Sequence, residues 1–330
     1  MASLAEIRAK LKQQETRGSN TGGGDNSIYP FWNMQEGQTA TIRFLPDGND
    51  SNTFFWSERL MIKLPFAGIK GETESRPVQV QVPCMEMYGE NCPILAEVRG
   101  WFKDQTLEDM GRKYWKKRSY IFQGFVTDNP IKEDPAPESP IRRFIIGPQI
   151  FQLIKAALMD PDMEDLPTDY TAGVDFRLQK GSKGGYADYG ASNWARKTRP
   201  LSDAEMKAVN EHGLYNLGDF LPKKPGEVEL KVMMEMFEAS VDGEPYDPDR
   251  WSQYFRPAGM AARTGDPNTV ASPNATATSQ SAPGVDKEDE VPFKSTEEAA
   301  QETATATTEA ASTNQGAQDI LAMIRARKNQ

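Results

Sequence analysis

The stretch "TATIRFLPDGND" (residues 39–50) decides the fold class of this 330-residue chain. Its first seven residues alternate in polarity, so that Ala40, Ile42 and Phe44 face one side of an extended strand. The "PDGND" that follows is typical of a turn. Similar short apolar runs predict five further strands, at 54–64, 78–82, 120–126, 142–146 and 174–178.

Helices are expected between these strands. Apolar periodicity predicts them at 149–159, 203–212 and 227–238, and a Ser202/Glu205 capping box marks the start of the second. Short strands outnumber helices, which favours an α+β fold that is mostly β. We expect a small, partly open barrel with helical additions.

The bulk composition limits the classes of function. The chain has 38 Lys+Arg and 48 Asp+Glu, a formal net charge of −10, so a site for a polyanion must be a local patch. Two cysteines make no disulfide framework, which favours a reducing, intracellular setting. No apolar run approaches the roughly 20 residues that span a bilayer, and the N-terminus lacks the apolar core of a signal peptide. We therefore expect a cytoplasmic protein that has no membrane partner.

Composition divides the chain into three zones. Residues 1–18 are a short basic arm, residues 19–256 hold most of the aromatic residues and predict the folded core, and residues 257–330 are poor in aromatic residues. Between residues 286 and 309 there are eight acids against two lysines, which predicts a disordered acidic tail. A scaffold that acts mainly through this tail, or as a DNA mimic, is one alternative function.

The arm has the pattern of a short amphipathic helix. Apolar residues recur along one face and bases lie beside them, and a helix this short should order only on a partner. The residues that we expect to mediate this protein contact are Leu4, Ile7, Arg8, Lys10 and Leu11. A shorter match near the C-terminus, with Leu321, Ile324, Arg325 and Arg327, suggests a competitor for the same groove or an independent partner site.

Catalytic side chains are scarce. The single histidine, His212, ends a predicted helix, where a surface histidine is typical. No phosphate-binding G-x-x-x-x-G-K-[ST] motif is present. Asp160, Asp162 and Glu164 leave open a metal-dependent nuclease, although acids in "MDPDMEDLPTD" are more typical of a solvated loop. We expect a protein that is not an enzyme.

Positive charge and aromatic rings occur in the same segments. Residues 99–120 hold seven bases and three acids, residues 177–199 hold six bases and one acid, and "RRF" at 142–144 adds a third cluster. Single-stranded nucleic acid is bound by this combination, because cations follow the phosphates and flat rings stack on unpaired bases. The alternative is that many of these rings belong to the core and that the bases only solubilise nearby turns.

We assign the two roles by residue type. The bases expected at the DNA interface, mostly as phosphate contacts, are Arg112, Lys113, Lys116, Lys117, Arg118, Arg142, Arg143 and Lys183. The rings expected to stack on DNA bases are Tyr114, Trp115, Tyr120, Phe122, Phe144, Tyr186 and Tyr189.

Five motifs carry a family resemblance: "TIRFLPDGND", "YGENCP", "YWKKRSY", "RRFIIGPQIF" and "GGYADYG" occur in this order. Together with the basic arm and the acidic tail, this set resembles the single-stranded DNA-binding (helix-destabilising) proteins of T-even-like bacteriophages. The resemblance implies an OB-fold core that coats single-stranded DNA in replication, recombination and repair in the cytoplasm of the infected bacterium. It further implies an arm that docks on the neighbouring copy for cooperative binding, and a tail that recruits phage replication and recombination proteins.

One departure from this family concerns metal. The family has a zinc site of one histidine and three cysteines, whereas here only Cys84 and Cys92 match and Leu95 stands where the next cysteine would be. Two thiolates cannot close a tetrahedral structural site, which leaves Glu86 or Glu90 as substitute ligands. We expect no metal and no other cofactor, with apolar packing around the two cysteines in its place.

Overall fold

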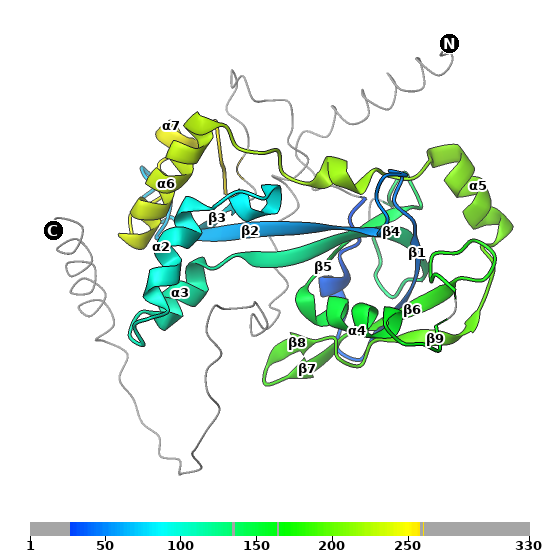
Figure 1. Ribbon diagram of the computed structural model, residues 1–330. Helices are drawn as coiled ribbons and strands as arrows, with labels where there is room; N and C mark the ends of the chain where they lie inside the picture. The colour runs from blue at the N-terminus through cyan, green and yellow to red at the C-terminus, as the bar shows by residue number, and fades with distance from the viewer. Residues whose placement is uncertain (1–26, 134–135, 164, 258–259, 261–330) are drawn as a thin grey trace, which may run out of the picture.

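The computed structural model describes residues 27–133, 136–163, 165–257 and 260. In this part the chain is a mixed α/β protein built on an antiparallel sheet (Figure 1). The strands are β1 (Thr39–Leu45), β2 (Trp56–Phe66), β3 (Val78–Pro83), β4 (Lys117–Asp128), β5 (Arg142–Ile146), β6 (Val174–Gln179), β7 (Gly181–Lys183), β8 (Tyr186–Asp188) and β9 (Asn193–Thr198). The helices are α2 (Pro93–Trp101), α3 (Glu108–Tyr114), α4 (Pro148–Leu158), α5 (Asp203–His212), α6 (Glu227–Val241) and α7 (Pro248–Trp251). Three 3-10 turns are η1 (Phe31–Asn33), η2 (Met85–Tyr88) and η3 (Leu217–Phe220).

Strand β4 organises the main sheet, whose order is β3-β2-β4-β1-β6-β9 with β5 on the other edge of β4. Leu45 of β1 lies opposite Gln123, and Trp56 of β2 lies opposite Phe122, so β1 and β2 follow one another along the same edge of β4. The ten residues between them, 46–55, therefore form a loop where two strands meet.

The sheet does not close into a barrel within the described residues, because its order ends at β3 and β9. The expected mostly-strand core with helical additions is confirmed, and the sheet in these residues is not a closed barrel. Strand β2 extends beyond the end of β4 and pairs there with β3.

Two hydrophobic cores lie along this ribbon. The helical lobe packs α2, α3, α6 and α7 on β3 and the second half of β2, and its buried residues include Ile62, Leu64, Val98, Trp101, Phe237 and Trp251. The sheet lobe packs α4 on β1, β4, β5 and β6, and its buried residues include Ile42, Phe44, Phe122, Phe144, Ile154 and Phe176. Figure 1 shows the two lobes at opposite ends of the ribbon. We call residues 57–60 of β2 and 117–119 of β4, which join the lobes, the neck.

The predicted helices agree with the structure at their starts. Helix α5 spans the expected residues, and both hydrogen bonds of its Ser202/Glu205 capping box are present. Helix α4 begins one residue earlier than expected, and α6 extends three residues further, to Val241. Helices α2 and α3 and strand β9 were not expected. In α3 the interior glycine, Gly111, weakens the helical pattern of the sequence; a Cβ there would lie 3.1 Å from the Phe102 ring, a tight contact, so glycine suits the packing at this position.

Candidate nucleic-acid interface

Six of the seven rings expected to stack on bases lie in the two cores. Their exposed fractions are at most 5%, and they are Tyr114, Trp115, Tyr120, Phe122, Phe144 and Tyr189. Tyr120, for example, stacks on Phe151 of α4 with ring centroids 3.5 Å apart. Burial also raises the pKa of Tyr189 to about 12. Because other side chains already cover these rings, we correct their role from base stacking to core packing.

Arg142 and Arg143 are also buried, at 3% and 5% exposed. The guanidinium of Arg142 donates two hydrogen bonds of 2.7 Å to the carboxylate of Glu133 and one of 3.0 Å to the carbonyl of Ile28. The guanidinium of Arg143 lies 3.6 Å from the centroid of the Phe220 ring. These contacts fix neighbouring segments on β5, so we correct the role of both arginines from phosphate contact to structural support.

The bases around the neck are closer to solvent. Nζ of Lys116 lies 2.6 Å from Glu86, and Nε of Arg118 lies 2.9 Å from Glu58. Lys117 is half-buried at the start of β4. Partly exposed ion pairs such as Arg118–Glu58 contribute only about 0–1 kcal/mol, so a phosphate can replace Glu58 at low cost.

Two further predicted bases lie on α3, at the helical lobe. Arg112 pairs with Glu108 one turn earlier, and Lys113 is exposed with its Nζ 5.8 Å from the ring of Tyr114. They share a lobe with Lys116 but not with the two predicted residues on the β7–β8 hairpin. The structure therefore divides the predicted bases between two ends of the ribbon.

The β7–β8 hairpin presents the one exposed ring of the predicted set. Tyr186 is 59% exposed and lies directly opposite the exposed Lys183 in the strand register. Gly184 and Gly185 have φ values of 61° and 82°, which the two-residue turn between these strands requires. The side chain of Gln149, in the first turn of α4, bonds Asp188 at 2.6 Å and the backbone of the next residue at 3.2 Å. The hairpin is thus held against α4 with a cation and a ring at its tip.

The sequence reasoning missed an aromatic pair where the 46–55 loop enters β2, formed by the exposed Phe54 and the half-buried Trp56. Phe54 is 57% exposed, and its ring lies on that of Trp56 with centroids 4.7 Å apart and an angle of 32°. Trp56 in turn packs edge-to-face on Phe151 of α4 at 5.3 Å. We call these two residues the Phe54–Trp56 platform. Its sequence signal was present as "FFW", but we assigned those residues to the interior of a strand.

Hydrogen bonds hold the platform in place before any ligand binds. The side chain of Asn52 accepts from the backbone N–H of Phe54 at 3.0 Å and donates to the carbonyl of Trp56 at 3.1 Å. It also donates to Asp47 at 2.7 Å, and that buried carboxylate accepts from the backbone N–H of Leu217 at 2.9 Å. An exposed ring on a rigid loop loses little entropy when a flat ligand stacks on it.

The first turn of α4 contacts both aromatic features. Phe151 contacts the platform, while Gln149, two residues earlier and therefore on the other side of the helix, holds the β7–β8 hairpin. Exposed cations on neighbouring strands, Arg177 of β6 with Arg196 and Lys197 of β9, add positive charge to this lobe. Such a surface suits a single-stranded nucleic acid, whose unpaired bases can stack on the rings while its phosphates lie near the cations.

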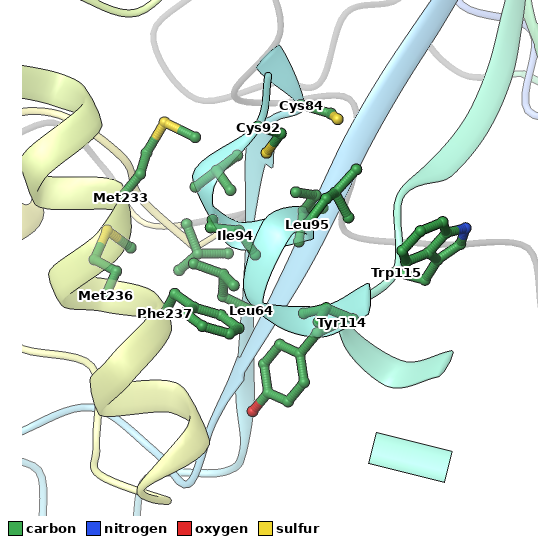
Figure 2. Close-up of a cluster of buried hydrophobic side chains, with 14 of the residues drawn as sticks. Leu64, Cys84, Cys92, Ile94, Leu95, Tyr114, Trp115, Met233, Met236 and Phe237 are labelled. Carbon is green, nitrogen blue, oxygen red and sulfur yellow. The ribbon is translucent and has the colours of Figure 1, made fainter. Parts of the chain in front are cut away.

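The two cysteines lie in the helical lobe. Cys84 and Cys92 are both buried, and Figure 2 shows them beside Ile94 and Leu95. The interaction between the two thiols lowers the pKa of Cys92 and, together with burial, raises the pKa of Cys84.

The substitute ligands considered for zinc are engaged elsewhere. Glu86 pairs with Lys116 and Arg99, and Glu90 pairs with Lys224. Within the described ranges there is no group of three or more His, Cys, Asp or Glu side chains placed to hold a metal ion. The residues present here therefore do not fit the four-ligand site that the family resemblance implies.

The structure describes three of the four candidate catalytic residues. His212 is exposed at the end of α5, and Asp160 and Asp162 are exposed in the loop after α4, where the side chain of Asp160 accepts from the backbone of Asp162. Glu164, the arm at 1–18, the C-terminal match at 321–327 and all but two residues of the 257–330 tail lie outside the described residues.

None of the helices in the described ranges is both long and apolar enough to cross a membrane. A scan against protein-family models and a search of curated proteins found no match to this chain.

Proposed function

We propose that this chain binds single-stranded DNA and does not catalyse a reaction on it. The observation that carries the proposal is the Phe54–Trp56 platform, in which the exposed ring of Phe54 lies on the half-buried ring of Trp56 and hydrogen bonds from Asn52 fix the backbone of both residues. A duplex hides the faces of its bases, so exposed rings of this kind favour unpaired bases. Stacking accepts every base, so the binding is expected to be tolerant of sequence.

The positive charge of the sheet lobe supports the same proposal. Lys183 lies beside Tyr186 at the hairpin tip, and other exposed cations lie on β6 and β9. In a chain with a net charge of −10, cations on this lobe form the local patch that a polyanion needs. We further propose that the open antiparallel sheet around β1 and β4 is an OB-fold.

The wider biological role follows from the family resemblance. We propose that the protein coats single-stranded DNA cooperatively during phage replication, recombination and repair in the cytoplasm of the infected bacterium. The basic arm would contact the neighbouring copy, and the acidic tail would bind phage replication and recombination proteins.

Tryptophan fluorescence tests the proposal directly. Titration of the full-length protein with oligo(dT) should quench its emission, and Trp56→Phe should remove a large part of that quenching. The apparent affinity should fall steeply as salt increases, because each neutralised phosphate releases counterions. A duplex of the same length should compete poorly. Absence of quenching and of binding at low salt would refute the proposal.

A further inference from the structure

Arg59, in the neck, is a buried cation that lacks a carboxylate partner. Its exposed fraction is 5%, and its Nε donates to Oγ of Ser119 at 3.1 Å, directly across the two strands. Among the residues that the structure describes, no Asp or Glu lies within ion-pair distance of its guanidinium. Burial alone lowers the pKa of Arg59 to about 10, so the side chain still carries its charge at neutral pH.

Two other buried arginines, Arg43 and Arg142, have carboxylate partners. Arg43 lies 3.6 Å from Asp175 and donates to two backbone carbonyls, and Arg142 holds Glu133 with two hydrogen bonds. A buried charge without such a partner costs several kcal/mol in a folded protein. The cost at Arg59 therefore calls for an anion that the chain itself does not provide at this position.

The surroundings of Arg59 suit a phosphate. Side chains alternate along a strand, so Lys117 and Ser119 of β4 share the face that carries Arg59. Glu58, the carboxylate next in sequence, lies on the opposite face, where it pairs with Arg118. A guanidinium beside a hydroxyl can offer several charge-assisted hydrogen bonds to phosphate oxygens, and the ammonium group of Lys117 adds positive charge on the same face.

One edge of the neck leads to this face. Strand β5 pairs with β4 only from Tyr120 onward, so in the described part of the chain the outer edge of β4 at residues 117–119 has no strand beside it. The β2 edge is covered, because the backbone N–H of Cys84 donates to the carbonyl of Leu60 at 3.0 Å. A single strand that stacks on the Phe54–Trp56 platform can pass round the β4 edge.

We propose that Arg59, supported by Ser119, is a buried anchor for one phosphate of the bound DNA strand. This inference rests on the proposed function and adds a phosphate position that neither the basic clusters nor the exposed rings indicate. It also explains why the unpaired charge of Arg59 is retained at the junction of the two lobes. A phosphate bound there would contact Arg59 of β2 and Ser119 of β4 together.

The test compares full-length Arg59→Met with the unmodified protein. The slope of log affinity for oligo(dT) against log salt should become shallower by about 0.7, the value for one phosphate contact on a single strand. Affinity at low salt should fall by about 10- to 100-fold, as for a hydrogen bond to a charged group. The thermal unfolding midpoint should stay the same or rise, because the substitution removes an unpaired buried charge.

Two control variants test whether the effect of Arg59→Met comes from the loss of any positive charge and whether it depends on the planar guanidinium group. Arg250→Met removes one exposed positive charge from α7, in the helical lobe, and should leave the slope unchanged. Arg59→Lys keeps the charge but loses the planar fork, and should give an affinity between those of the unmodified protein and Arg59→Met.

The slope decides the outcome. An unchanged slope in Arg59→Met overturns the anchor, whether or not the midpoint falls, since Arg59 would then be structural. If the unmodified protein fails to bind oligo(dT), the proposed function is refuted, and inorganic phosphate becomes the probe for the anchor. Phosphate should then raise the unfolding midpoint of the unmodified protein but not that of Arg59→Met; an equal response in both overturns the anchor as well.

Discussion

Replacing Phe54 by alanine isolates the contribution of the exposed platform to DNA binding. The ring is 57% exposed and lies over Trp56, so its outer face is available to a base. Stacking of one base on an aromatic side chain contributes about 1–3 kcal/mol. Because 1.4 kcal/mol corresponds to a factor of ten, Phe54→Ala should raise the Kd for oligo(dT) by roughly 5- to 150-fold.

The same substitution should cost little stability. A fully buried phenylalanine loses about 3–5 kcal/mol on truncation to alanine, but less than half of the Phe54 surface is covered. We therefore expect a loss of about 1 kcal/mol, which shifts the thermal midpoint by about 2–4 °C in a domain of this size. The loss of affinity should thus exceed what partial unfolding explains.

Val228→Ala is the matched control. Val228 is 59% exposed on α6, in the helical lobe, so its truncation also removes exposed apolar surface but should leave the Kd unchanged. Both variants should be titrated with oligo(dT) at several salt concentrations, because an effect on stacking persists at high salt whereas an effect on charge does not. If Phe54→Ala and Val228→Ala both bind within twofold of the unmodified protein, the platform is not a base-binding site.

Three other predictions concern the core, the ion pairs and metal. Phe144→Leu should lower stability by about 1–2 kcal/mol in urea unfolding and leave the Kd for oligo(dT) unchanged, since this ring is fully buried; weaker binding at equal stability would restore its stacking role. Burial opposes ionisation of Glu205, but hydrogen bonds from Arg199 and from the helix N-cap outweigh it and lower the pKa of this carboxyl. Glu205→Gln should therefore cost about 2 kcal/mol above pH 5, and the difference should shrink as the pH falls through the lowered pKa; a difference independent of pH would contradict the ionic role. EDTA should leave the thermal midpoint unchanged, and stoichiometric zinc at Cys84 and Cys92 in untagged protein would show that this expectation is wrong.

Local signals in the sequence were sufficient for several elements. The alternation at 39–45 predicted β1, and the Ser202/Glu205 pair located the start of α5 because a capping box acts within one turn. The starts of α4 and α6 followed from apolar periodicity in the same way. These elements are determined by neighbours in sequence, which a single sequence displays.

Elements and contacts determined by distant residues were not predictable in this way. Helix α3 contains Gly111 because the Phe102 ring fills the space beside it, and no local pattern reveals that contact. The burial of Tyr120 depends on Phe151, which comes from a helix thirty residues later in the chain. Likewise the sequence of Arg142 and its neighbours suggests a surface base, because the ion pair with Glu133 forms only in the folded structure.

The coincidence of bases and rings has a simple structural cause. Along β4 burial increases from the half-buried neck at 117–119 to the buried stretch at 120–125, so Arg118 reaches Glu58 while Tyr120 and Phe122, on the same face, pack in the sheet lobe. A strand that runs from a partly exposed neck into a core therefore places cations and aromatic residues close together in the sequence, with or without a nucleic-acid ligand. The pattern by itself identifies a strand and not a binding site.

A ring that is exposed and rigidly held is the better evidence. Strand alternation does not place Phe54, because it lies in the 46–55 loop between β1 and β2, and core packing does not require a ring that is 57% exposed. Exposure of a large apolar side chain carries a hydrophobic cost, and the hydrogen bonds of Asn52 keep the ring in that exposed position. The same reasoning applies to Arg59, where burial of an unpaired charge carries an electrostatic cost. Both costs are removed when a base covers the ring and a phosphate reaches the guanidinium, which is why these two positions, and not the richest basic segments, are the most informative targets for substitution.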